Sequence, residues 1–137
     1  MDTYNISLSK TSKKILLALL KGFEKNPRGK GLIVEDIAVI IMGADALVGS
    51  MNNLKLFRQQ LEALPSKAHE SFKRRYVKEE ARERIQREMT TLIKSNLVKS
   101  ITLGECNRYM LTENGIIAAK KIRDELLSII NEYRMFL

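Results

Sequence analysis

The sequence predicts a mainly α-helical single domain that carries one small β-hairpin. Over most of the chain, apolar residues recur at intervals of three and four, the period of an α-helix with one buried face. Near the C-terminus this pattern is replaced by a β-branched run, LVKSITL, then the turn-forming letters GECN and a second short run, RYMLT. A chain of 137 residues, 45% of them hydrophobic and only two of them proline, has the size and composition of one folded domain, residues 1–137.

Three helices are expected in the first half of the chain. The first covers residues 9–25, with Ser9 or Thr11 as its N-terminal cap, and ends at Asn26-Pro27, because proline disfavours a helical conformation in the residue before it. After a turn at residues 28–31, the segment LIVEDIAVIIMG (residues 32–43) begins with a β-prone pair and continues as a short helix with acidic residues in its first turn. A third helix is expected from about residue 50 to residue 64.

The second half is expected to contain a long charged helix, the hairpin and a final helix. The charged helical stretch spans residues 66–96, with a break near Arg74. The hairpin follows, with strands at residues 97–103 and 108–112, and Thr112 then caps a last helix that runs to the C-terminus. Because a two-stranded hairpin is not stable alone, we expect it to lean on the helices or to serve a surface role.

The chain is basic, with a net charge of +8 and a pI of about 9.7. The excess is concentrated in two blocks, since residues 1–30 and residues 67–99 each sum to +5, whereas residues 31–66 sum to −2 and residues 100–137 to zero. Such a surface attracts polyanions, of which nucleic acid is the commonest and an anionic membrane surface the next. The open alternative is that the basic pI only confers solubility.

The sequence offers no candidate for catalysis, a metal centre or a cofactor. One histidine, His69, and one cysteine, Cys106, cannot form a zinc site within one chain, and neither has a neighbour expected to activate it. We therefore expect a protein that is not an enzyme and has no cofactor, with Cys106 in an exposed turn as a candidate redox sensor. Without a run of about 18 apolar residues or a signal-peptide pattern, a cytoplasmic protein with no membrane partner is expected.

Three segments resemble the winged-helix family of DNA-binding proteins, in particular regulators of the MarR and PadR type. LIVEDIAVIIMG resembles the helix that begins the helix-turn-helix, QREMTTLIKSNLV the end of the recognition helix, and RYMLTENG the second wing strand with the start of the next helix. The resemblance covers about residues 10–120 and implies that residues 93–115 form the wing of a core at about residues 9–115. In the family a few residues join the two motif helices, whereas about thirty separate them here (residues 44–73), so an extra inserted helix is expected.

The resemblance implies a DNA-reading helix at residues 77–95. Its apolar positions, which share one face, are Val77, Ala81, Ile85, Met89 and Leu92. The polar positions expected at DNA are Tyr76, Arg84, Arg87, Thr90, Thr91 and Lys94. Arg84 and Arg87 are the best candidates for base edges, because arginine can pair bidentately with guanine. The lysines and arginine expected at phosphates are Lys99 and Arg108 in the wing and Lys13 and Lys14 near the start of the first helix.

Two alternatives to this interface stay open. Glu80 and Glu83 precede the two arginines by four residues, so that i,i+4 ion pairs would make this surface an ordinary solvated helix face. The large separation of the motif helices also leaves residues 51–64 as a second candidate for the reading helix, with the polar positions Asn52, Asn53, Lys55, Arg58 and Gln59.

The final helix, about residues 112–137, is predicted to be a dimerisation helix. Its apolar stripe repeats at intervals of four and three and comprises Ile122, Leu126, Ile129, Tyr133 and Phe136. The stripe is longer than docking on a small domain requires, so pairing with a second copy would bury it; packing on the first helix of the same chain is the alternative. In a dimer, two reading helices would match half-sites about 34 Å apart.

Together these expectations describe a homodimer that binds double-stranded DNA with sequence selectivity, as a transcriptional regulator does. Phosphate contacts would supply most of the affinity and a few base contacts the selectivity. The alternative is a winged-helix module for protein interaction, or a replication or partition accessory factor. The expected partners are duplex DNA and a second copy of the chain, with no effector assigned.

Overall fold

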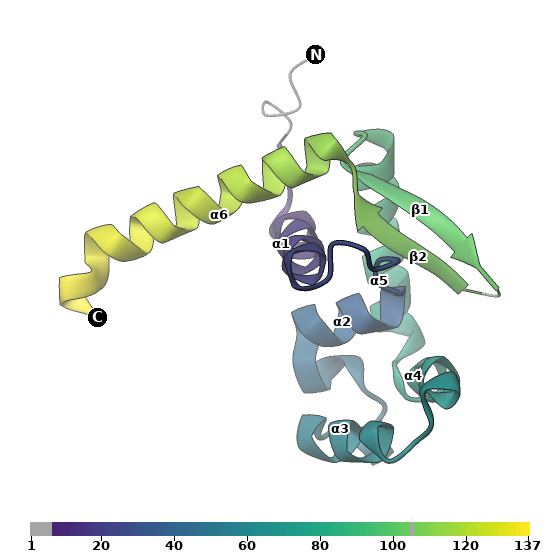
Figure 1. Cartoon of the computed structure of the whole chain (residues 1–137). Helices are drawn as coiled ribbons and strands as arrows, with labels where there is room; N and C mark the ends of the chain where they lie inside the picture. Colours follow the sequence, from purple (N-terminus) through teal and green to yellow (C-terminus); the bar gives the residue numbers. More distant parts are fainter. Residues whose placement is uncertain (1–6, 105) are drawn as a thin grey trace.

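The computed structural model describes residues 7–104 and 106–137. Its principal elements are α1 (Lys10–Lys25), α2 (Val34–Met42), α3 (Leu54–Glu62), α4 (His69–Tyr76), α5 (Glu79–Lys94), β1 (Val98–Leu103), β2 (Cys106–Leu111) and α6 (Glu113–Tyr133), as Figure 1 shows. The fold is mainly helical and carries a two-stranded antiparallel hairpin, with α3 and α4 inserted between α2 and α5. The predicted fold class, an α fold with a β-hairpin wing, is confirmed.

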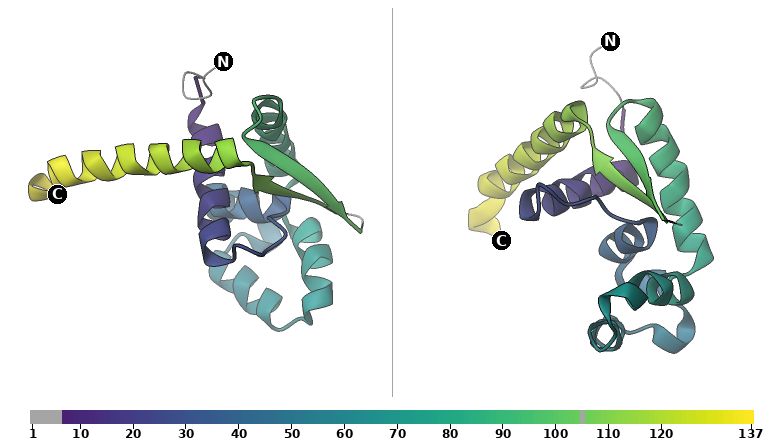
Figure 2. Two further views of the ribbon diagram at one scale, coloured as in Figure 1. Left: turned by 45° about the horizontal axis from the view of Figure 1, so that its top comes forward. Right: turned by 45° about the vertical axis from the view of Figure 1, so that its right-hand side comes forward.

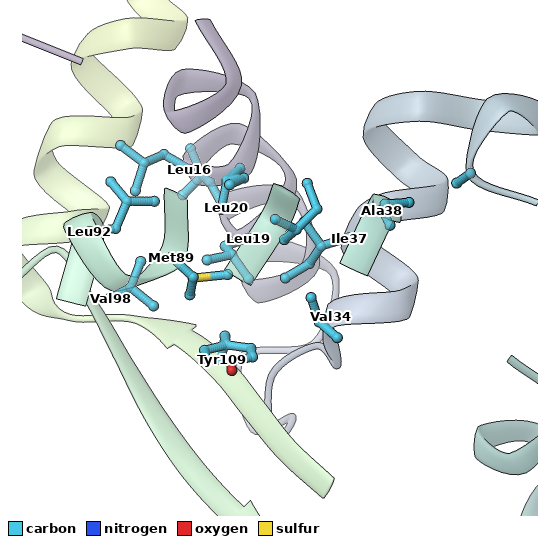
Figure 3. Packing of buried hydrophobic residues seen from close by; sticks show 14 of the residues in the cluster. Leu16, Leu19, Leu20, Val34, Ile37, Ala38, Met89, Leu92, Val98 and Tyr109 are labelled. Carbon is cyan, nitrogen blue, oxygen red and sulfur yellow. The ribbon is translucent and has the colours of Figure 1, made fainter. Parts of the chain in front are cut away.

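One hydrophobic core joins α1, α2 and α5 and is closed by the base of the hairpin (Figure 3). The side chains that meet there include Leu16, Leu20, Ile37, Met89, Leu92, Val98 and Tyr109. Each is buried because it lies on the apolar stripe of its own helix or on the inner face of its strand. Burying one such side chain contributes about 1.5–3 kcal/mol, so this cluster holds α5 at a defined rotation against α1 and α2.

Local signals at the helix ends agree with the sequence-based expectations. The Ser9 hydroxyl accepts a hydrogen bond from the Ser12 amide across 3.0 Å and caps α1, and Asn26 ends that helix. The Thr112 hydroxyl accepts from the Gly115 amide across 3.0 Å and caps α6. Helices α1 and α6 therefore each begin at the residue that follows their cap.

The hairpin pairs residues from Val98↔Leu111 to Leu103↔Cys106, and Leu32 adds an isolated bridge to Tyr109 on the other side of β2. The β-prone start of the segment before α2 thus extends the small sheet. The predicted turn GECN was too long, because Cys106 and Asn107 belong to β2. Thr102 and Asn107 face each other across the strands and share a 2.9 Å hydrogen bond, which extends the pairing toward the tip.

The break in the charged helical stretch lies later than predicted. Val77 was expected on the buried face of the reading helix, but its backbone is extended (φ −85°, ψ 130°) and it forms an isolated bridge with Leu47. The Lys78 amide donates to the Ala46 carbonyl across 2.7 Å, and α5 begins only at Glu79. A buried β-branched residue that pairs with a distant segment here overrides the helical pattern of the sequence.

The inserted helices α3 and α4 pack on each other through aromatic side chains. The ring centroids of Phe57 and Phe72 lie 5.3 Å apart, and those of Phe72 and Tyr76 lie 4.7 Å apart. Phe57 is buried and belongs to the core cluster, and Phe72 and Tyr76 pack against that cluster, so this contact joins the insert to the main core. The insert is therefore an ordered part of the fold beside the N-terminal end of α5 (Figure 1).

The helix α6 packs on α1 at its beginning and then leaves the body of the protein (Figure 2). Gly115, Ala118 and Ala119 are buried, and Arg123 forms an ion pair with Glu24 near the end of α1. From residue 124 onward every residue is exposed. None of the helices in the described ranges is both long and apolar enough to cross a membrane.

Candidate nucleic-acid interface

The side of α5 opposite its buried stripe is exposed and polar. Ala81, Ile85, Met89 and Leu92 face the core, and the right-hand view of Figure 2 shows one long side of α5 turned away from the other elements. The predicted DNA contacts on this helix that are exposed are Arg84, Arg87, Thr90, Thr91 and Lys94. The structure therefore brings these five side chains onto one accessible surface, as the helical periodicity predicts.

The ion pairs that would neutralise this surface are absent from the part of the chain that the structure describes. Neither Glu80 with Arg84 nor Glu83 with Arg87 is within ion-pair distance. Both guanidinium groups are thus available to an external acceptor. Thr90 differs, because its hydroxyl donates to the Gln86 carbonyl of its own helix across 3.0 Å.

Charge is unevenly distributed along α5. Glu79, Glu80 and Glu83 are exposed near its N-terminal end, where carboxylates are stabilised by the helix dipole. The exposed cations on the outer surface follow from Arg84 to Lys94. A polyanion would therefore be attracted to the middle and C-terminal half of α5 and repelled from its first turn.

Ser12 of α1 and Ser9, which caps α1, hold α5 in place from one flank. The Ser12 hydroxyl donates to the Glu88 carboxylate across 2.8 Å, and the Ser9 hydroxyl donates to the same oxygen across 3.0 Å. The sequence offered Ser9 only as one of two candidate caps, and no local pattern gave Glu88 a role. The contact also brings the first turn of α1, with the exposed Lys13 and Lys14 next to Ser12, toward the α5 flank.

Charged residues of α2 and α4 hold α5 from the other flank. Arg82 Nη1 lies 3.9 Å from Glu35 and donates to the Arg74 carbonyl across 3.2 Å, while Lys73 pairs with Asp36 across 2.8 Å. Burial raises the pKa of the Glu35 carboxyl above its usual value, and its hydrogen bond to a backbone amide and the charge of Arg82 act in the opposite direction. The inserted α4 is therefore tied to both α2 and α5.

The two predicted wing contacts differ in their surroundings. Lys99 is exposed on β1, the strand at the free edge of the hairpin. Arg108 on β2 is only partly exposed, forms an ion pair with Glu70 of α4 and lies 3.5 Å from the Gly31 carbonyl. The contact of Arg108 with phosphate stays a prediction, and in this structure its guanidinium joins the hairpin to the insert.

Tyr76 also differs from its predicted position. It is the last residue of α4, and its partly buried ring packs against Phe72, with the Arg75 guanidinium 5.3 Å from the ring centroid. Tyr76 is thus part of the aromatic contact within the insert and lies outside α5.

The second candidate reading helix, α3, also presents its polar positions to solvent. Asn52, Lys55, Arg58 and Gln59 are exposed. Asn53 is exposed as well, but its side chain accepts a hydrogen bond from the Leu56 amide and caps α3. This helix remains accessible to a partner.

The predicted dimer residues divide into two groups. Ile122 is partly buried against the core, in agreement with packing on the first helix of the same chain. The other four extend the same stripe beyond α1 and are exposed: Leu126 by 45%, Ile129 by 53%, Tyr133 by 52% and Phe136 by 83%. Intrachain packing therefore accounts for the beginning of the stripe and leaves most of it uncovered in this chain.

Cys106 is buried in β2, which argues against the exposed redox sensor considered from the sequence. Burial, and to a lesser extent a hydrogen bond to Glu70, raises the pKa of its thiol and disfavours the reactive thiolate.

Across residues 7–104 and 106–137, no three histidine, cysteine or acidic side chains are grouped to hold a metal ion. Comparison with known proteins adds no assignment, since no family model, curated protein or solved structure matches the chain.

Proposed function

We propose that the protein binds double-stranded DNA with sequence selectivity as a homodimer and acts as a transcriptional regulator without catalytic activity. The observation that carries the proposal is the exposed surface of α5, where Arg84 and Arg87, beside Thr91 and Lys94, form no ion pair with any residue of the described ranges. Arginine reads guanine bidentately in the major groove, threonine contacts a thymine methyl, and lysine contacts phosphate. Such a protein would act in the cytoplasm, by occupying its duplex site.

The fixed orientation of α5 supports this function. The hydrogen bonds from Ser9 and Ser12 to Glu88, and the contact of Arg82 with Glu35, hold the helix on both flanks. A reading helix needs such support, because base contacts depend on the placement of side chains within a groove. Lys99, on the hairpin that follows α5, would add a phosphate contact.

The homodimer is proposed from the uncovered end of α6. Its exposed residues Leu126, Ile129 and Tyr133 lie on the stripe that packs on α1 earlier in the same helix. A second copy of α6 is a self-complementary cover for this stripe, as in a two-fold symmetric helix pair. Two copies of α5 would then contact two half-sites of one duplex.

The second candidate function is a protein-interaction module, and the same end of α6 favours it. An exposed apolar helix can dock in a groove of a different protein as well as on its own copy. Under this alternative the polar surface of α5 has no specific partner. A replication or partition accessory factor would share the DNA contacts and differ only in its biological outcome.

Salt-dependent duplex binding separates these functions. Fluorescence anisotropy would be measured with a labelled random duplex and with a duplex recovered by selection from a random pool, at several salt concentrations. DNA binding predicts that the logarithm of the affinity falls steeply with the logarithm of the salt concentration, and that the selected duplex binds more tightly. The absence of duplex binding at low salt, from a protein shown to be folded, would overturn the proposal and favour the interaction module.

A further inference from the structure

We propose that the insert formed by α3 and α4 is a second nucleic-acid contact, which binds the phosphate backbone of the duplex beside the groove that α5 reads. This inference rests on the DNA binding proposed above and adds a surface to it. From the start of α3 to the end of α4, residues 54–76, six residues are basic and two are acidic, so the segment sums to +4 with its histidine neutral. A surface of this sign attracts phosphate oxygens whatever the base sequence.

Most charged side chains of the insert that reach solvent are cations. The exposed ones are Lys55, Arg58, Lys67, Arg74 and Arg75. Glu62 is the one exposed carboxylate within residues 54–76, and the other, Glu70, is paired with Arg108. Within the described part of the chain Lys55, Arg58 and Lys67 form no ion pair, so no neighbouring carboxylate neutralises their charge.

The insert adjoins the N-terminal end of α5, whereas the hairpin follows the C-terminal end of that helix (Figure 1). Gly49, just before α3, lines a depression of the surface together with Glu80 and Glu83 of α5. Glu83 precedes Arg87 by about one helical turn, so these two residues lie on the same side of α5. The insert therefore begins beside the side of α5 that carries Arg87.

The length of α5 brings a DNA backbone toward the insert. The 16 residues of α5 span about 24 Å at 1.5 Å per residue, whereas the major groove is about 12 Å wide. A duplex that receives the middle of α5 in its groove therefore has a backbone strand near each end of the helix. At the N-terminal end the carboxylates of Glu79, Glu80 and Glu83 repel phosphate, and the cations of the insert supply the opposite charge.

The insert is held in place by contacts at both of its ends. The Val48 amide donates to the Tyr76 carbonyl across 2.9 Å, which joins the segment before α3 to the end of α4. Lys73 of α4 pairs with Asp36 of α2 across 2.8 Å. Because these contacts already order the insert, a duplex would not have to order it on binding.

Two variants with the same loss of charge test the surface. The insert variant carries Lys55→Gln, Arg58→Gln and Lys67→Gln. The control variant carries Lys21→Gln, Lys25→Gln and Arg28→Gln, at exposed positions near the end of α1 and in the loop after it. Circular dichroism establishes that both are folded. Fluorescence anisotropy with the random and the selected duplex, at several salt concentrations, then gives each affinity and its salt slope.

The insert variant should bind both duplexes at least about tenfold more weakly than the parent, with the magnitude of the salt slope reduced by about two to three, since each lost phosphate contact removes about 0.9. The ratio of the two affinities should stay the same, because backbone contacts carry no sequence information. The control variant should lose less than about threefold, with an unchanged slope. Equal losses in the two variants would indicate long-range attraction only and would overturn the inference.

The same titrations separate this inference from the proposed function. A folded parent that binds no duplex would overturn the function and the inference with it. A parent that binds duplex while the insert variant behaves as the control variant would overturn the inference alone. If the insert variant fails to fold, Lys67→Gln replaces it, with Lys21→Gln as its control, and should reduce the salt slope by about one.

Hydroxyl-radical footprinting locates the contact on the duplex. The probe is a longer duplex with the selected site at its centre, at protein concentrations that saturate it. The parent should protect the central site and the backbone that flanks it, and the insert variant should lose only the flanking protection. The same protected backbone in both proteins would overturn the inference. Anionic vesicles are the other surface that a basic patch can bind. Binding of the parent to phosphatidylserine vesicles that the insert variant loses, with duplex binding unchanged, would also overturn it.

Discussion

Ser12 of α1 donates a hydrogen bond to Glu88 of α5 across 2.8 Å and joins two residues 76 positions apart in the sequence. Ser12 is only 2% exposed, so its hydroxyl has no access to bulk water as a substitute partner. Glu88 lies on the flank of α5, next to the exposed positions of the candidate DNA surface. This contact therefore links the stability of the core to the orientation of α5.

Glu88→Ala is predicted to destabilise the fold by about 1–3 kcal/mol, because it leaves the buried Ser12 hydroxyl without its acceptor. Glu88→Gln should cost less, since the amide oxygen can still accept a hydrogen bond. Urea denaturation followed by circular dichroism gives both values. Glu83→Ala is the control, because Glu83 is exposed on the same helix and should change stability by no more than about 0.5 kcal/mol. Equal effects at positions 83 and 88 would contradict the assigned role of Glu88.

Gly115→Ala is predicted to destabilise the fold by about 3 kcal/mol or more. A Cβ atom at Gly115 would collide with the backbone carbonyl oxygen of Leu97, and backbone cannot move aside as a side-chain tip can. That carbonyl also accepts a hydrogen bond from the Thr112 amide across 3.1 Å, so the start of α6 is held against it. The measurement is the free energy of unfolding in urea, with Gly49→Ala as the open-space control. A near-neutral Gly115→Ala would show that α6 does not lie this close to Leu97.

The effect of Glu35→Gln on the free energy of unfolding, relative to the parent protein, is predicted to be more favourable at neutral pH than at acidic pH. Burial raises the pKa of the Glu35 carboxyl in the folded state above its value in the unfolded chain. The folded state therefore binds this proton more tightly. The stability that this proton contributes is fully present below the pKa of the unfolded chain and is lost as the pH rises through the pKa of the folded state. Glutamine does not titrate, so the variant does not lose stability in this way.

The measurement for Glu35 is a comparison of unfolding free energies at several pH values. The difference between the variant and the parent, variant minus parent, should become more positive from about pH 4 to pH 7. Glu62→Gln serves as the control, because it removes one carboxylate at an exposed position. A difference for Glu35 that falls with pH would show that the attraction of Arg82 outweighs burial.

Ile129→Glu is predicted to convert a dimer into a monomer while the fold remains intact. Ile129 is 53% exposed in the single chain, so a carboxylate there costs little in the monomer but would be buried in a helix pair. Sedimentation velocity at micromolar concentration gives the mass of each form. Ser128→Glu introduces the same charge one residue away, on a different side of α6, and should leave the dimer unchanged. A parent protein that sediments as a monomer would contradict the proposed dimer.

Arg84→Ala and Arg87→Ala are predicted to reduce selectivity, and Lys99→Ala to reduce affinity. Loss of a base-reading arginine should cost about 1–3 kcal/mol on the selected duplex and much less on a random duplex. Loss of a phosphate contact should weaken both duplexes alike and reduce the magnitude of the salt slope by about one. Anisotropy titrations with both duplexes at several salt concentrations distinguish the two outcomes.

Arg58→Ala in α3 is the matched control for the α5 variants, because Arg58 is also exposed and lies on the second candidate reading helix. Parent-like binding by the Arg84 and Arg87 variants, together with lost selectivity in Arg58→Ala, would assign DNA reading to α3. The same comparison therefore tests both helices.

Local sequence signals determined most of the element order of this protein. The helical spacing of apolar residues, the Ser9 and Thr112 caps and the β-branched run before Gly104 each act within a few neighbouring residues, and the corresponding elements form as predicted. The exposure of Arg84 and Arg87 was predictable for the same reason, since one helical period places them away from the buried stripe.

Tertiary structure alone decided what each element contacts. Val77 leaves the helical pattern because it pairs with Leu47, and Arg108 turns from the wing surface to Glu70 of the insert. The Ser12–Glu88 hydrogen bond likewise joins segments far apart in the chain. The physical reason is that these contacts depend on how packed helices and strands meet in space. The periodicity of a single segment specifies which of its sides is buried, but not which distant residue covers it.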